Sequence, residues 1–288
     1  MAGVALLPEP GQEADRYISR VSCAARGTVS GVRLPYDEAG SGTAVVLLHA
    51  GVADRTMWRE HLEPLAAAGY RVVAVDLPGF GEALVAPGEQ APWNDVLETV
   101  AGLGLGQAAL VGNSFGAAIA VRVALVAPAA VSALVLISAP SPDLEPSPEL
   151  QAVWDAENAA VERGDVEAAV RAVVDGWTLP DAPEELRERV AAMQRRAFEV
   201  QAAGTGAVDA PDPLERDPDG LARLDMPVLV AVGERDLSDF REGARMLASA
   251  LPGSRLVTIP GAGHLAPLET PAAFRELLLG FLAESAGD

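Results

Sequence analysis

Short runs of apolar residues recur along the chain, separated by segments with helical spacing. Each run is nearly continuous in apolar residues, which is typical of strands buried on both faces of a parallel sheet. The runs are Val45–Leu48, Val72–Val75, Ala109–Val111, Leu134–Ile137, Val228–Val232 and Leu256–Ile259. Because strands alternate with helices, the pattern predicts an α/β fold with a doubly wound, mostly parallel sheet.

Further elements complete this sheet. Residues 17–37 predict one or two additional strands, with Gly27 and Gly31 at turns or bulges. The sheet is therefore expected to have about eight strands. Helices are expected over Met57–Ala68, Ser114–Val126 and Pro271–Ala283.

One apolar stretch, residues 117–140, is long enough to cross a bilayer. Arg122 lies inside it and Pro128 divides it. A buried helix followed by a buried strand is therefore the better interpretation, and we expect no membrane partner.

The alternation of strands and helices stops between residues 141 and 223. Three segments with helical spacing follow there, over about Pro148–Arg163, Val166–Asp175 and Pro183–Ala203. A helical insertion after the sixth strand is expected to lie as a cap over the C-terminal edge of the sheet, where ligands bind in open α/β sheets. We therefore expect an N-terminal extension over 1–16, a core over 17–140 and 224–288, and a helical cap over 141–223.

The composition narrows the possible partners and compartments. The 288 residues include 21 Lys and Arg against 41 Asp and Glu, so the formal net charge is −20. This charge disfavours nucleic acid and anionic lipid surfaces as partners. Cys23 is the single cysteine, so internal disulfides and cysteine-based zinc sites are excluded. The first residues lack a basic start and make a poor secretory signal, which favours a cytoplasmic location.

A serine stands between two glycines where a predicted strand ends and a predicted helix begins. The segment is Gly112-Asn113-Ser114-Phe115-Gly116. A sharp turn from strand to helix holds a serine hydroxyl clear of the backbone, and the glycines allow the strand and helix to pass closely. The segment predicts a nucleophile elbow with Ser114 as the nucleophile.

A serine nucleophile needs a base and a group that orients the base. His264 lies in a glycine-rich loop after the last predicted strand, and we expect it to be the base. His49 is expected to hold the loop that follows its strand, and His61 to be a surface or helix-face residue. Asp236, just after the strand over 228–232, is the preferred acid. Glu234, Asp239 and Asp143 are its competitors.

Developing negative charge on a substrate oxygen needs hydrogen-bond donors. The backbone N–H of Phe115, just after the serine, is one expected donor. Gly51, in the loop after the strand over 45–48, is the first choice for the second donor, and Val52 is the alternative.

With these features the chain resembles the α/β-hydrolase superfamily over about residues 28–283. The matching motifs are LLHAG at 47–51, DLPGFG at 76–81, GNSFG at 112–116, GERD at 233–236 and GAGH at 261–264. The resemblance implies a triad of Ser114, Asp236 and His264, an oxyanion hole from Gly51 and Phe115, and no cofactor or metal. There are two departures: Ala50 replaces a common glycine, and Asn113 stands where histidine is frequent. Asp76 in the DLPGFG turn is interpreted as structural.

The resemblance leaves several activities open. The preferred one is hydrolysis of a small or medium carboxylic ester or lactone through an acyl-enzyme intermediate. The alternatives are a serine-dependent carbon–carbon bond hydrolase or lyase, and a small-molecule binding protein that keeps the triad without turnover. Val52 and four cap residues are candidates for an apolar substrate pocket, and the cap residues could instead serve simple packing: Trp154, Trp177, Met193 and Phe198. The sequence does not indicate the oligomeric state.

Overall fold

A single sheet organises the protein, and its strand order brings the predicted site loops to one edge. The computed structural model describes residues 34–141 and 144–285. Within these ranges the main sheet has seven strands in the order β1-β3-β2-β5-β6-β8-β9. They are β1 (Tyr36–Gly40), β2 (Thr43–Leu48), β3 (Tyr70–Val75), β5 (Ala108–Asn113), β6 (Val131–Ile137), β8 (Val228–Gly233) and β9 (Arg255–Ile259).

The sheet is parallel except at one edge. β1 pairs antiparallel with β3, and every other neighbouring pair is parallel. The mostly parallel sheet is confirmed. The predicted upstream strands fall largely outside the described residues, as do Gly27, Gly31 and the expected extension over 1–16; β1 begins only at Tyr36. The described sheet therefore has seven strands where the sequence predicted about eight.

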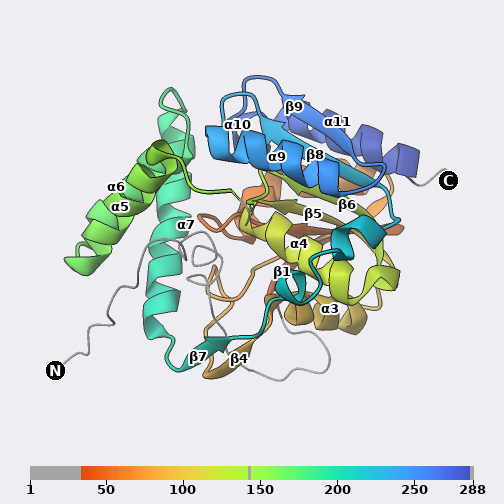
Figure 1. Cartoon of the computed structure of the whole chain (residues 1–288), viewed down its shortest axis with the longest axis horizontal. Helices are drawn as coiled ribbons and strands as arrows, with labels where there is room; N and C mark the ends of the chain where they lie inside the picture. Colours follow the sequence, from red (N-terminus) through yellow and green to blue (C-terminus); the bar gives the residue numbers. More distant parts are fainter. Residues whose placement is uncertain (1–33, 142–143, 286–288) are drawn as a thin grey trace.

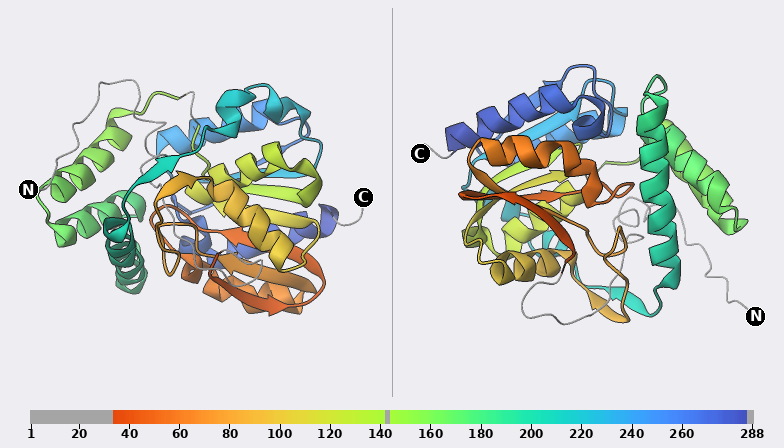
Figure 2. Two further views of the ribbon diagram at one scale, coloured as in Figure 1. Left: turned by 90° about the horizontal axis from the view of Figure 1, so that it is seen from below. Right: turned by 180° about the vertical axis from the view of Figure 1, so that it is seen from behind.

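Helices cover both faces of the sheet, as a doubly wound fold requires. α2 (Arg59–Ala67) and α11 (Pro271–Ser285) pack together on one face, which Figure 2 shows from behind. α4 (Phe115–Val126) and α9 (Ser238–Ala250) lie on the other face, in front of the strands in Figure 1, and α3 (Pro92–Gly102) packs beside α4.

The expected helix over 57–68 begins instead as a 3-10 turn, η1 (Arg55–Trp58), and continues as α2. Asp54 starts this turn, because its side chain accepts a hydrogen bond from the Thr56 N–H at 2.8 Å.

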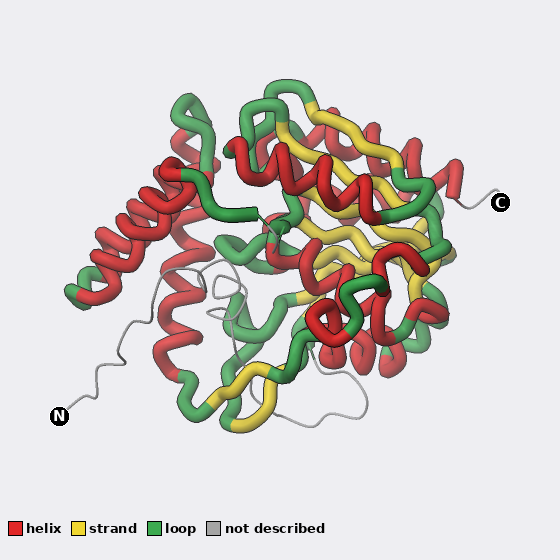
Figure 3. Tube along the Cα trace, in the orientation of Figure 1, coloured by secondary structure: helices red, strands yellow, loops and turns green. Residues whose placement is uncertain are grey.

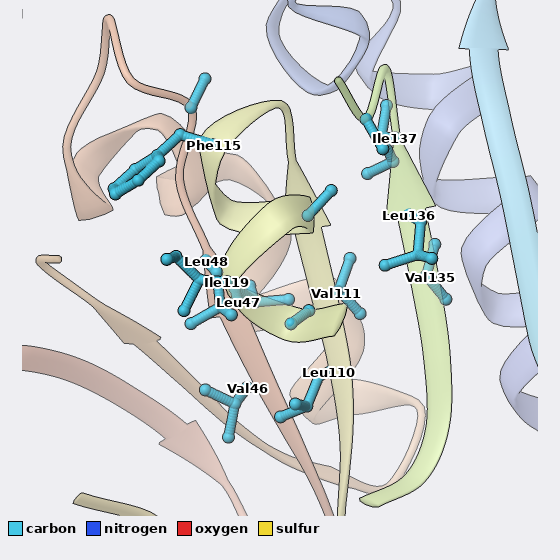
Figure 4. Packing of buried hydrophobic residues seen from close by; sticks show 14 of the residues in the cluster. Val46, Leu47, Leu48, Leu110, Val111, Phe115, Ile119, Val135, Leu136 and Ile137 are labelled. Atoms are coloured by element: carbon cyan, nitrogen blue, oxygen red, sulfur yellow. The ribbon is translucent and has the colours of Figure 1, made fainter. Parts of the chain in front are cut away.

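The apolar core is continuous through the sheet and its covering helices. Figure 4 shows Ile119 of α4 beside Leu47 of β2 and Val111 of β5. All three side chains are buried. The apolar stretch over 117–140 is therefore most of helix α4, the short turn η2 (Pro128–Ala130) and strand β6.

Arg122, the charge inside that stretch, is buried in α4. It forms an ion pair with Asp212 and donates a hydrogen bond to the Ala118 carbonyl at 3.0 Å. A buried arginine is tolerated because its donors are satisfied. In the part of the chain that the structure describes, no helix is long and apolar enough to span a bilayer.

Three helices lie between β6 and β8 and form a body beside the sheet (Figures 1 and 3). They are α5 (Pro148–Glu162), α6 (Val166–Trp177) and α7 (Glu184–Ala203), close to the expected ranges. We call residues 148–203 the three-helix segment. Its buried faces join the same apolar cluster as the sheet, through residues such as Val174 and Val190.

The chain returns from α7 to the sheet by a short ribbon. β7 (Ala207–Asp209) pairs in parallel with β4 (Gly88–Gln90), below the sheet in Figure 1. α8 (Pro213–Arg216) and η3 (Gly220–Arg223) then lead into β8, while α10 (Ala266–Glu269) follows β9.

Candidate active site

Ser114 lies at the turn from β5 into α4 with a strained backbone. Its φ is 53° and its ψ is −113°, a left-handed conformation that non-glycine residues rarely adopt. The Ser114 N–H donates to the Ile137 carbonyl of β6 at 2.8 Å, so the strain is held by the sheet. This is the geometry expected of a nucleophile elbow.

The glycines on either side of Ser114 are required by close packing. A Cβ atom on Gly112 would collide with the backbone of Gly116 and Ala117, where the strand and the helix pass. A Cβ atom on Gly116 would collide with the Leu48 carbonyl at the end of β2. Any side chain at either position would push α4 away from the sheet.

His264 and Asp236 meet after β9 and β8. The His264 Nδ1 atom lies 3.1 Å from Oδ1 and 3.3 Å from Oδ2 of Asp236. Both side chains are buried, with 4% and 0% of their surface exposed. Because the carboxylate accepts from Nδ1, it fixes the tautomer in which Nε2 is the basic nitrogen.

Two aromatic rings enclose the imidazole of His264. The ring centroid of Trp177, at the end of α6, lies 4.6 Å from that of His264. The ring of Phe240 in α9 lies 4.2 Å away, and it also contacts Trp177 at 5.8 Å. Trp177 was predicted as a pocket residue, and the structure places it against the histidine. Phe240 was missed, since the sequence offers no signal for which face of α9 meets the site.

Asn113 connects the serine strand to the histidine loop. Its Nδ2 atom donates to the carbonyl oxygens of His264 at 3.1 Å and Ile137 at 3.3 Å. Residues 113 and 264 are far apart in sequence, so these bonds bring the serine turn and the histidine loop together. The sequence showed Asn113 only as a departure from the common pattern.

The competing carboxylates serve other contacts. Glu234 accepts from the Gly261 N–H at 2.9 Å, and Asp239 accepts from the backbone and hydroxyl of Ser147 at 2.6 and 2.7 Å. The Ser147 hydroxyl in turn accepts from the Leu150 N–H and caps α5. Asp143 lies outside the described residues. Asp236 is thus the carboxylate found on His264.

The other two histidines are buried. His49 accepts from the Leu77 N–H at Nε2 and lies 2.8 Å from the Ala50 carbonyl at Nδ1, so it holds the loop after β2. Burial lowers its pKa, which keeps the ring neutral. The expectation that His61 is a surface residue is wrong in one respect: it lies on a helix face, but that face packs against α11. Burial lowers the pKa of His61 to about 4.

The predicted oxyanion donors lie at the start of α4 and in the loop after β2. Phe115 is the first residue of α4, where helical N–H groups have no partner within the helix. The loop after β2 turns at residues 50–53, with the Ala53 N–H bonded to the Ala50 carbonyl at 3.0 Å. Gly51 in this turn is half-buried and Val52 is buried. The contact between Gly116 and the end of β2 brings this turn beside the start of α4.

Apart from Val52 in the loop after β2, the remaining candidate pocket residues belong to the three-helix segment. Met193 is buried, while Trp154 and Phe198 are partly buried against the continuous apolar core. Asp76, interpreted as structural, binds the backbone and guanidinium of Arg55 and the N–H of Glu82. That carboxylate thus holds a loop next to the site.

The described residues contain no group of His, Cys, Asp and Glu side chains that could hold a metal ion. A surface groove of about 420 Å³ lies near the C-terminal end of α4, lined by residues such as Trp93, Val126 and Arg216. Ser114 lies at the opposite end of that helix. The groove is therefore separate from the triad residues.

The chain is similar to known proteins over most of its length. Residues 45–277 match the alpha/beta hydrolase family. The chain belongs to this family. The match spans β2 to α11 and includes Ser114, Asp236 and His264.

Individual members of the alpha/beta hydrolase family are similar along almost the whole chain. The 2-hydroxy-6-oxo-6-(2'-aminophenyl)hexa-2,4-dienoic acid hydrolase of Metapseudomonas resinovorans is 29% identical over 89% of each chain. The structure of a thermophilic esterase from Thermogutta terrifontis has a TM-score of 0.73 and 28% identity, covering 91% of this chain and 97% of that one. Est816, an N-acyl homoserine lactone degrading enzyme, has a TM-score of 0.69 and 26% identity, covering 88% and 98%. These similarities identify the chain as a hydrolase.

Proposed function

We propose that this protein is a serine hydrolase that cleaves a small or medium carboxylic ester or lactone through an acyl-enzyme intermediate. The observation that carries the proposal is the pairing of His264 with Asp236, on a loop that is hydrogen-bonded to Asn113 next to the strained elbow of Ser114. A serine hydroxyl is a poor nucleophile at neutral pH unless a neutral imidazole accepts its proton. The triad supplies that imidazole and orients it.

The proposed reaction has two stages. The Ser114 Oγ atom attacks the acyl carbon while the His264 Nε2 atom takes its proton, and the N–H groups of Gly51 and Phe115 bind the oxyanion. The leaving alkoxide takes the proton from His264, and the Ser114–acyl ester remains. Water then attacks this ester, passes a proton to His264, and Ser114 recovers its proton as the carboxylic acid leaves.

The three-helix segment is proposed to be the cap that selects the substrate. It contacts the loops at the C-terminal edge of the sheet, through Arg196 and the Gly81 carbonyl at 3.0 Å and through Gln201 and the Gly79 carbonyl at 3.3 Å. Met193 and Phe198 of α7 and Trp154 of α5 are the proposed apolar lining, with Val52 from the body. A pocket of this composition favours apolar acyl groups.

A second candidate is carbon–carbon bond hydrolysis by the same triad. It is supported by relatives such as the Metapseudomonas resinovorans enzyme and the 2-hydroxymuconate semialdehyde hydrolase of a Pseudomonas strain, which is 29% identical over 89% of this chain. Here the leaving group is a carbanion, so a proton must be delivered to carbon before the acyl group is released.

The test combines active-site labelling with a substrate panel. Intact-mass analysis should show a single fluorophosphonate adduct on the parent chain and none on Ser114→Ala. Nitrophenyl esters, lactones and a 2-hydroxy-6-oxo-dienoate are then compared by kcat/KM. Higher kcat/KM for esters or lactones supports the first candidate, and higher kcat/KM for the dienoate supports the second. Labelling without turnover of any of them would favour a binding protein that keeps the triad.

A further inference from the structure

Glu269 stands between the histidine loop and the three-helix segment. It is the last residue of α10, five positions after His264. Its Oε2 atom accepts from the Gly263 N–H at 2.7 Å, and its Oε1 atom accepts from the Leu179 N–H at 3.1 Å. Gly263 immediately precedes the histidine, and Leu179 lies in the loop that joins α6 to α7.

The end of α6, which leads into this loop, contacts the imidazole itself. Trp177 precedes Leu179 by two residues, and its ring packs on His264. The Leu179 side chain leaves no room beside the histidine loop, because a Cβ atom on Gly263 would lie 2.8 Å from Leu179 Cδ2. Residues 177–179 therefore pack against the residues around His264, and the Glu269 carboxylate hydrogen-bonds to both sides of this contact.

The other supports of the histidine loop come from the body of the protein. Asn113 donates to the His264 carbonyl, the Arg235 N–H donates to the Ala262 carbonyl at 2.8 Å, and Gly233 packs against the carbonyl of Gly263. Glu269 differs because one of its two donors belongs to the three-helix segment. A solvent-facing ion pair between Arg235 and Asp181, at 2.8 Å, lies along the same contact.

Burial makes the charged form of the Glu269 carboxylate less stable than it would be in water. Burial raises the pKa of Glu269, while the N–H groups of Gly263 and Leu179 and the nearby His264 oppose the shift and Asp236 adds to it. Arg235 also lies close enough to interact with it. A glutamine of equal size would avoid burying a charge, but its amide has one acceptor oxygen for two N–H donors.

We infer that Glu269 is a positioning residue that makes the placement of His264 depend on the docking of the α6–α7 loop. When Leu179 is docked, the Glu269 carboxylate accepts from the N–H groups of Leu179 and Gly263 and fixes the backbone next to His264. When the loop moves away, Glu269 loses one donor and Trp177 leaves the imidazole. The inference rests on the proposed role of His264 as the base, and it makes the three-helix segment part of the control of turnover as well as of substrate choice.

The main test compares two Glu→Gln substitutions in residues that bind the histidine loop. Glu269→Gln leaves one of two N–H groups without an acceptor. Glu234→Gln is the matched control, because Glu234 accepts only the Gly261 N–H in that loop and an amide oxygen can replace it. The readouts are kcat and KM for p-nitrophenyl butyrate and the rate of fluorophosphonate labelling at Ser114 for the folded fraction.

A displaced catalytic base lowers the chemical rate, so kcat and the labelling rate of Glu269→Gln should both fall by about 10- to 100-fold. KM should change little, and Glu234→Gln should behave like the parent. A purely structural role would lower the melting temperature and leave the rates of the folded enzyme unchanged. Parent-like kcat and labelling in folded Glu269→Gln would overturn the inference.

A second pair of variants covers the case in which Glu269→Gln does not fold. Gly263→Ala places a methyl group 2.8 Å from Leu179 Cδ2 and 3.1 Å from Glu269 Oε1 and should lower kcat. Adding Leu179→Ala removes the nearer contact, keeps the Leu179 N–H, and should recover part of kcat. Equal kcat in the single and double variants would contradict the coupling. If the parent chain is neither labelled nor active, the proposed function fails instead, and the two failures are thereby separated.

Discussion

The edge of the sheet and the three-helix segment are held in different ways. At the edge, backbone hydrogen bonds connect neighbouring strands directly, such as Ser114 N–H to Ile137 and Ser138 N–H to Ala231, both at 2.8 Å. The three-helix segment joins this edge through apolar packing and through long side chains such as Arg189, which binds Glu60 and the Thr56 carbonyl.

The contrast separates two tasks. Reacting groups need a fixed geometry, and a buried sheet with paired backbone groups provides it. Helices attached by side chains can change their lining residues without altering the strands, and this suits the role in substrate choice that we propose for the three-helix segment. The following predictions test how far the two regions are independent.

The largest effect should come from the body of the protein. Ser114→Ala removes the proposed nucleophile and should lower kcat by about 10⁶-fold, the order seen when a triad serine is removed. Thermal unfolding should change little, because the sheet continues to hold the turn.

Ser138→Ala is the matched control. Ser138 also ends a strand, is buried and has a positive φ of 48°, but it is not part of the triad. It should keep parent-like turnover. Equal loss in both variants would mean that disturbance of the strand ends, and not loss of a nucleophile, stops the reaction.

The next largest effect should separate two neighbouring carboxylates. Asp236→Asn should lower kcat by about 10⁴-fold, because the amide no longer fixes the histidine tautomer. Asp239→Asn loosens the contact with Ser147 at the start of α5 and should lower the melting temperature while most of the turnover remains. Both variants are measured with one nitrophenyl ester. A large loss of kcat in Asp239→Asn and not in Asp236→Asn would show that Asp239 is the acid.

A substitution in the three-helix segment should affect stability and specificity. Met193→Ala empties a buried position of α7 and should lower the free energy of unfolding by about 2–5 kcal/mol, whereas Met193→Leu should lower it by less than about 1.5 kcal/mol. The order of kcat/KM over a series of acyl chain lengths should change in Met193→Ala. Fluorophosphonate labelling of Ser114 should stay close to the parent rate; a loss as large as that in Asp236→Asn would show that position 193 affects the reacting groups as well as the proposed pocket.

The smallest expected effect is a pH dependence of stability in the body of the protein. The pKa of His61 falls from 6.5 to about 4 on burial, so between these values the unfolded chain binds a proton that the folded chain does not. The free energy of unfolding should therefore be highest above pH 6.5 and fall by up to about 3 kcal/mol as the pH is lowered to 4.

His61→Phe should make this part of the curve shallower when unfolding in urea is followed at several pH values. A residual slope is expected because burial also lowers the pKa of His49. A variant curve as steep as that of the parent would exclude His61 as a source of the dependence.

Much of the fold could be predicted because its signals are local. Continuous apolar runs such as Val228–Val232 have one favourable placement, the interior of a parallel sheet, and the observed strand β8 extends this run by a single residue. The three helices of the inserted segment were also expected, with ends shifted by one or two residues. The 3-10 start at Arg55 was missed because a side chain of Asp54, and not helical periodicity, sets that turn.

The residues of the candidate triad could be predicted from the sequence because each follows a strand in a recognisable motif. The side chains that pack around them could not be predicted. Phe240, Glu269 and the burial of His61 depend on which helix face meets which loop. Residues such as Leu179 and Gly263 are far apart in sequence, and no periodicity relates them.

The sequence by itself determined the alternation of strands and helices, the sharp turn at Ser114 and the order of serine, acid and histidine, because each depends on neighbouring residues and on backbone sterics. Tertiary structure alone decided that Phe240 packs on His264, and that Trp177 and Glu269 connect the three-helix segment to the residues around the imidazole. These contacts depend on the packing of separate elements into one core, and packing is settled by the shapes of all the side chains together.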